Sequence, residues 1–176
     1  VFAKALGNGH PIAAVIGTRA AMDGAEESFI SSTYWTEAVG PTAALATIEK
    51  MQKTNASDYV NKIGKIVQND WITLAAKHGI DIECSGLPCL AHFSFKNHSL
   101  ELKTLYTVLM LDEGFLGNTA LYPTLAHDDK VLALYRDAID NVFGKIADIM
   151  KSGGIDAVLH ALDGKVCQTG FKRLLK

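Results

Sequence analysis

The chain has 176 residues, of which 48% are hydrophobic and 20% are charged, a composition typical of a globular protein with one domain or two small lobes. Its formal net charge of -2 argues against binding to the phosphates of nucleic acid, and the lack of an apolar run of about 18 residues argues against a membrane span. The three cysteines are an odd number without tight spacing, which favours neither a disulfide framework nor a zinc site and predicts a reducing, cytoplasmic location.

The first 40 residues predict a strand, a turn and a polar loop. The chain opens on VFAK without an initiator Met, so we expect a fragment that begins inside a strand, the alternative being a trimmed start. Residues 7–11 (GNGHP) are turn formers, because Gly and Asn tolerate positive φ. The apolar run 12–17 predicts a buried strand, residues 18–22 predict a helical turn, and residues 24–37 predict a loop rich in hydroxyl groups.

Helical periodicity dominates the remainder of the chain. Apolar residues recur at three- and four-residue steps over 39–51, over 57–77, over 100–111 and over 128–151. Gly79 is expected to stop the second of these helices, and the pair of glycines at 153–154 is expected to end the last one.

Three short strands are predicted between the helices. Residues 80–84 and 89–95 alternate apolar and polar side chains, as in a sheet with one buried face, and residues 85–88 form the turn between them. Residues 115–117 are expected to form a third strand, and the residues from 162 onward a polar and basic tail.

The one feature that suggests chemistry is Lys4, which stands directly before the glycine-rich turn. A lysine at the end of a strand can present its amine to a cofactor, and a desolvated lysine forms Schiff bases readily. A solvated surface lysine is the alternative. The turn lacks the residues of a P-loop or a dinucleotide fingerprint, and the six His show no metal-binding spacing. Cys84 and Cys89 are expected to be apolar strand residues.

Two segments together carry a resemblance to a known family. Residues 2–12 read FAKALGNGHPI and residues 31–37 read SSTYWTE, followed by an Ala-rich helix. This resembles the active-site region of class III aminotransferases of fold type I, which use pyridoxal 5'-phosphate (PLP), and within them the glutamate-1-semialdehyde aminomutases. The resemblance implies that Lys4 forms the internal aldimine with PLP. It also implies that Thr33, with Ser32 as a second candidate, binds the phosphate of PLP across a homodimer interface.

The resemblance also implies a fold. The whole protein is expected to be α/β, and this chain to be its C-terminal portion, with α+β architecture. Residues 1–55 are expected to be the remnant of a large PLP-binding domain, and residues 56–176 a small α+β domain.

The chain departs from the family pattern in two places. The usual Gly-Gly-Asn-Pro after the Thr-Tyr pair is replaced by WTEAVGP, and no Arg precedes Pro123 to clamp a substrate carboxylate. The groups that pair with the pyridine nitrogen, stack on the ring and cradle the phosphate lie upstream of the lysine in this family.

The leading hypothesis is therefore a PLP-dependent aminotransferase or aminomutase (an isomerase) that acts on small-molecule amino donors and acceptors, with no nucleic-acid or membrane partner. Two alternatives remain open: a non-catalytic α+β module without cofactor, and a phosphate-ligand binder that uses the turn at residues 7–9.

Overall fold

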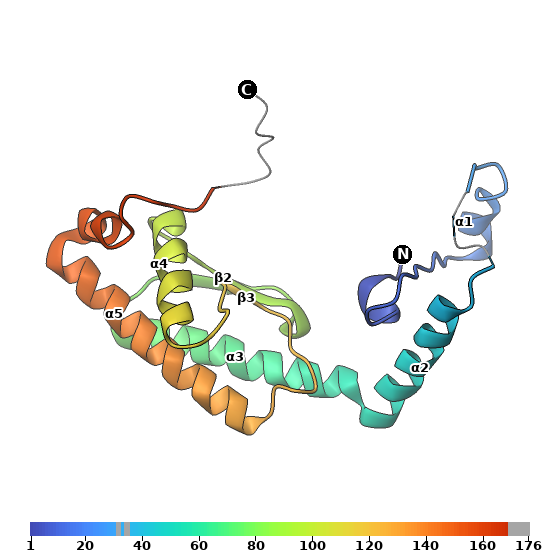
Figure 1. Cartoon of the computed structure of the whole chain (residues 1–176), viewed down its shortest axis with the longest axis horizontal. Helices are drawn as coiled ribbons and strands as arrows, with labels where there is room; N and C mark the ends of the chain where they lie inside the picture. The colour runs from blue at the N-terminus through green and yellow to red at the C-terminus, as the bar shows by residue number, and fades with distance from the viewer. Residues whose placement is uncertain (31–32, 34–35, 169–176) are drawn as a thin grey trace. The chain divides into compact units, whose positions relative to one another are not determined.

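The computed structural model describes residues 1–30, 33 and 36–168 (Figure 1). The chain divides into two compact units, Val1–Ala56 and Ser57–Lys176. That the first unit belongs to a large PLP-binding domain stays a prediction.

The first unit consists of a bridged turn and two helices. Its elements are the 3-10 helix η1 (Lys4–Leu6), the helix α1 (Arg19–Asp23) and the helix α2 (Val39–Thr54). The hydroxyl of Thr18 accepts a hydrogen bond from the backbone N–H of Ala21 and so caps α1, which confirms the predicted helical turn. Helix α2 ends at Asn55, whose φ of 47° is left-handed.

The predicted strand at 12–17 is wrong. Only Ala14 pairs, in an isolated antiparallel bridge to Phe2, while Val15 and Ile16 are 62% and 68% exposed. A strand needs a neighbouring backbone over several residues, and in this unit the segment around Phe2 supplies a partner for one residue only.

The second unit is a small antiparallel sheet with helices on one face. Strands β1 (Ile82–Ser85), β2 (Ala91–Phe95) and β3 (Ala120–Leu121) pair in the order β1-β2-β3, with a short 3-10 turn η2 (Pro88–Leu90) before β2. Alternate residues of β2 are buried, as the period of two predicts. The predicted strands at 80–84 and 89–95 are thus confirmed within two residues, except that Pro88 opens a 3-10 turn through Cys89.

Three long helices complete this unit: α3 (Ala56–His78), α4 (Ser99–Asp112) and α5 (Asp129–Ala161). In Figure 1, α4 and α5 cross next to each other, with the sheet beside them. Asp128 caps α5 by accepting the N–H of Val131 at 2.9 Å, and Gly79 follows α3 with a φ of 70°. The helices predicted from periodicity are confirmed.

One expectation for this unit is wrong. The third strand lies at Ala120–Leu121 and not at 115–117, because Phe115 packs its ring 5.6 Å from that of Tyr135 and Gly117 lies against Met110. The expectation for the glycine pair at 153–154 is confirmed: Gly153 and Gly154 have non-helical backbone, so the first part of α5 ends there at a kink. A second helical segment follows within α5 and places Val158 in the core.

An aromatic cluster forms the centre of the core. The ring of Phe93 on β2 lies 5.0 Å from that of Trp71 on α3, 5.3 Å from that of Tyr106 on α4 and 6.0 Å from that of Phe143 on α5. One strand residue thereby joins all three helices to the sheet, with tilted or edge-on ring geometries that favour aromatic packing. No helix in the described part of the chain is long and apolar enough to cross a bilayer.

Candidate functional site

Lys4 stands at the end of a short antiparallel bridge. The backbone N–H of Phe2 donates to the carbonyl of Ala14 at 2.7 Å, and the N–H of Ala14 donates back to Phe2 at 2.7 Å. Lys4 begins η1 two residues later, and its side chain is exposed. Within the described residues, the ammonium group makes no hydrogen bond or ion pair. The bridge therefore presents a free primary amine at the beginning of the glycine-rich turn.

The backbone of Lys4 is unusual. Its φ is 52°, in the left-handed region. The other described non-glycine residues with positive φ are of the types that tolerate this conformation, namely Asn8, Asn55, His98 and Asp163. A lysine gains no comparable local hydrogen bond from its side chain, so the conformation costs roughly 1 kcal/mol or more. Contacts with neighbouring residues must therefore maintain this backbone conformation of Lys4.

The turn after Lys4 is closed by glycine. The carbonyl of Lys4 accepts hydrogen bonds from the N–H groups of Gly7 and Asn8. A Cβ atom on Gly7 would lie 2.1 Å from the carbonyl oxygen of His10 and 2.7 Å from Cγ2 of Ile12. Any larger residue at position 7 would therefore push the two arms of the turn apart.

The start of α2 packs on this turn. Gly40, in the first turn of α2, is buried, and a Cβ on it would lie 2.9 Å from the carbonyl oxygen of Pro11 and 3.2 Å from Cβ of Ile12. Glu37 accepts hydrogen bonds from the backbone N–H groups of Val39 and Gly40, the second at 2.9 Å. A shallow pocket of about 350 Å³ opens beside these contacts, lined by His10 and by residues of α2 and its N-cap.

Glu37 is a residue of this site for which the sequence predicted no role. An acid two or three residues before the first helical N–H groups is a capping signal, which could have identified it.

Thr33 and Ser32 are the residues expected to bind the phosphate of PLP. Thr33 is an exposed turn residue, and within the described part of the chain no hydrogen bond joins it to Lys4. Ser32 lies outside the described residues. Their assignment to the phosphate of PLP stays a prediction.

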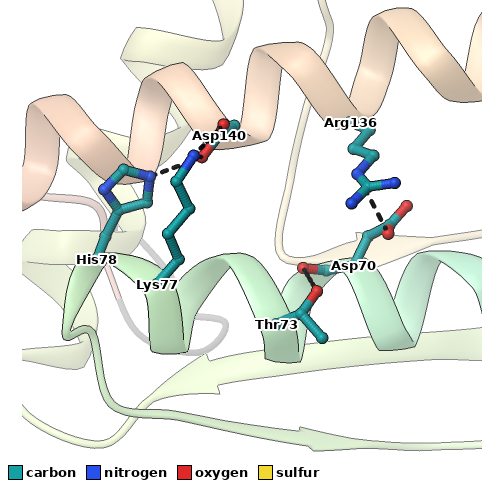
Figure 2. A network of polar contacts seen from close by, with 6 residues as sticks. All are labelled: Asp70, Thr73, Lys77, His78, Arg136 and Asp140. Atoms are coloured by element: carbon teal, nitrogen blue, oxygen red, sulfur yellow. Dashed lines mark hydrogen bonds and ion pairs between the residues drawn. The ribbon is translucent and has the colours of Figure 1, made fainter.

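Two groups of charged side chains in the second unit bridge α3 and α5 (Figure 2). Asp140 accepts a hydrogen bond from the ammonium of Lys77 at 2.6 Å and lies 2.7 Å from Nε2 of His78. These two contacts, that of Lys77 foremost, lower the pKa of Asp140. Ion pairs between partly exposed side chains of two helices contribute modestly to stability, so we assign the contacts of Asp140 with Lys77 and His78 a structural role.

A second pair in Figure 2 behaves differently. Arg136 lies 3.6 Å from Asp70, yet burial of the carboxyl raises the pKa of Asp70 because desolvation outweighs the attraction of Arg136. Burial also raises the pKa of the Cys84 thiol, which disfavours the reactive thiolate. Within the described residues, no cluster of His, Cys, Asp or Glu could hold a metal ion.

Comparison with known proteins supports the aminotransferase resemblance. The chain is 26% identical over 144 residues to 2'-deamino-2'-hydroxyneamine transaminase of Streptomyces kanamyceticus, a match that covers 79% of this chain and 37% of that protein. Other curated matches are aminotransferases as well. No protein-family model matches the chain.

The structural neighbours agree. The PLP internal-aldimine form of the FumI protein of a Sphingopyxis species superposes with a TM-score of 0.75 at 19% identity, over 87% of this chain and 38% of that one. A transaminase with PLP bound superposes with a TM-score of 0.70 at 19% identity, over 82% and 37%. This chain has the fold of part of a PLP-dependent transaminase.

This transaminase-like chain spans less than two fifths of the length of the proteins it matches, as 37% and 38% coverage show. The expected α+β architecture and the expected likeness to a portion of a PLP-dependent transferase are confirmed.

Proposed function

We propose that this chain is part of a class III PLP-dependent aminotransferase or aminomutase, in which Lys4 binds the cofactor. The observation that carries the proposal is the setting of Lys4: an exposed amine without a partner in the described chain, on a left-handed residue before a closed glycine turn. The aminotransferase relatives and the PLP-bound neighbours support it.

The residues fit the chemistry of the cofactor. PLP is an aldehyde and reacts with an unprotonated primary amine. The amines of Lys77 and Lys145 are held in ion pairs with Asp140 and Glu113 at 2.6 Å and 2.7 Å. Lys4 has no such pair to break, and its left-handed backbone before the closed turn fixes the point of the chain from which its amine extends, which supports its assignment.

When bound, PLP withdraws electrons from the substrate and so makes the proton on its α-carbon acidic. Nζ of Lys4 would then act as the general base and acid that moves this proton between the α-carbon of the substrate and C4′ of the cofactor. The hydroxyl of Thr33, with Ser32 as a second candidate, would donate a hydrogen bond to the phosphate of the cofactor held in the neighbouring chain. A homodimer with shared sites follows from that role.

The proposed substrates are small-molecule amino donors and acceptors. No Arg stands in the segment 121–125, so a dicarboxylate clamp from that segment is not expected. A cytoplasmic location belongs to the same proposal, supported by three cysteines that are all free.

The test is an absorbance titration of the purified chain with PLP, followed by borohydride reduction and peptide mapping. We expect a visible band and a reduced adduct on Lys4. Lys4→Ala should lose both, whereas Lys50→Ala, which removes an exposed lysine of α2, should keep both. Absence of the band, or label scattered evenly over surface lysines, would overturn the assignment of Lys4.

A further inference from the structure

We propose that Glu37 is a positioning residue for Lys4. Its carboxylate fixes the start of α2 against the glycine-rich turn and thereby holds the backbone of the lysine. This inference rests on the proposed function, since that function gives Lys4 its role. Three successive contacts connect the carboxylate of Glu37 to Lys4.

The first contact is between Glu37 and the beginning of α2. The N–H groups at a helix N-terminus have no partner within the helix. Both oxygens of Glu37 are used: one accepts the N–H of Val39, and the other accepts the N–H of Gly40 at 2.9 Å. A carboxylate at this end of a helix is also favoured by the helix dipole. Glu37 therefore sets the position of the first turn of α2.

The second contact is between that first turn and the strand-like arm after the glycine turn. Gly40 is buried, and the space that a Cβ would take on it is filled by the carbonyl oxygen of Pro11, Cβ of Ile12 and one carboxylate oxygen of Glu37. The backbone of residues 11–12 thus rests directly on the element that Glu37 holds.

The third contact runs from that arm back to Lys4. Ile12 lies against Gly7, whose N–H donates to the carbonyl of Lys4, and Ala14 closes the bridge to Phe2 on the other side of the lysine. Both flanks of Lys4 are therefore fastened to one arm, and that arm rests on Gly40. This chain of contacts explains how a lysine is kept at a φ of 52°.

The same contacts bear on the phosphate-binding alternative. The N–H groups of Val39 and Gly40 are already used by Glu37. A phosphate ligand at this helix end would have to displace that carboxylate, so we assign Glu37 a positioning role within the chain.

The test compares Glu37→Ala, which removes both acceptor oxygens, with Glu37→Gln, which keeps one. Glu27→Ala is the matched control, because it removes an exposed carboxylate from the same unit. The first measurement is amide hydrogen exchange of each full chain without PLP. Glu37→Ala should speed exchange in peptides covering residues 7–14 and 38–43 by about fivefold, the factor that corresponds to a lost helix-capping interaction of ~1 kcal/mol. Peptides of the second unit report whether the chain is folded and should not change.

The second measurement is the amount of PLP fixed on Lys4 by borohydride. Glu37→Ala should reduce it, Glu37→Gln should restore part of it, and Glu27→Ala should leave it unchanged. Unchanged exchange at residues 7–14, or faster exchange with undiminished labelling of Lys4, would overturn the role of Glu37. If the unmodified chain carries no label on Lys4, the proposed function fails, and the exchange data still decide whether Glu37 holds the turn.

Discussion

Nε2 of His78 lies 2.7 Å from Oδ1 of Asp140, which joins the last turn of α3 to the middle of α5. Lys77 reaches the same carboxylate, so one acid ties two consecutive residues of α3 to a helix more than 60 positions further along the chain. The long helices of the second unit are thus connected at their surface as well as through the aromatic core.

This carboxylate gives stability that depends on pH. Because the pKa of Asp140 is lowered in the folded chain, its contribution is present above the unfolded value of about 3.9 and is lost as pH falls through the lower folded value. Asp140→Asn should reduce the free energy of unfolding at pH 7 by about 0.5–1 kcal/mol, a magnitude set by the partial exposure of the pair. Urea unfolding at pH 7 and at pH 3 measures it.

The control for that prediction is Asp148→Asn, because Asp148 is highly exposed and only 3.9 Å from Lys151. It should change the free energy of unfolding little at either pH. An equal loss for Asp140→Asn at both pH values would show that the ionised carboxylate is not what joins α3 to α5.

Tyr135 and Tyr106 are buried tyrosines whose hydroxyl groups contribute differently to one hydrogen-bond network. The indole Nε1 of Trp71 donates to the hydroxyl of Tyr135 at 3.2 Å, and the hydroxyl of Tyr106 lies 3.5 Å from the same oxygen. Tyr135→Phe leaves the buried indole N–H without an acceptor and should lower the free energy of unfolding by about 1–3 kcal/mol. Tyr106→Phe removes only the longer contact and should cost less. Chemical denaturation that ranks the two in the reverse order would contradict this network.

Helix α3 packs closely against the turn before β2 at Gly64. A Cβ on Gly64 would lie 1.8 Å from the carbonyl oxygen of Pro88. Gly64→Ala should therefore destabilise the second unit by roughly 1–3 kcal/mol, although alanine is the better helix former by about 1 kcal/mol. Asn69→Ala, at an exposed site of the same helix, should stay within about 0.5 kcal/mol of the unchanged chain. Thermal unfolding of both variants shows whether the steric overlap at Gly64 outweighs the higher helix propensity of alanine.

A substitution at Gly7 should disturb the glycine-rich turn that follows Lys4. Because a Cβ there would meet the carbonyl of His10 at 2.1 Å, Gly7→Ala should open the turn and speed amide exchange over residues 7–14. The second unit should unfold at an unchanged denaturant concentration, since Gly7 lies in the first unit. Labelling of Lys4 by PLP should fall in parallel. An unchanged exchange pattern would mean that the turn accommodates a side chain.

Predictions from the sequence succeeded where one element decides its own structure. The helices over 39–51, 57–77 and 100–111 were read from apolar spacing, and the stop at Gly79 from its tolerance of positive φ. They failed where pairing depends on a distant segment. The apolar run 12–17 lacks a partner beyond Ala14, and residues 115–117 are engaged by helices, so the third strand forms at Ala120–Leu121.

For the candidate site, too, the sequence predicted local features and did not predict contacts between distant segments. The order of residues in the chain determined that Lys4 precedes a turn and that the chain resembles PLP-dependent aminotransferases, because turn formers and family motifs are local patterns. Only the tertiary structure decided that this lysine has left-handed backbone and that Glu37 and Gly40 press α2 against Pro11. Those features arise from close packing between segments some 30 residues apart, and no local pattern specifies which backbone atoms will meet.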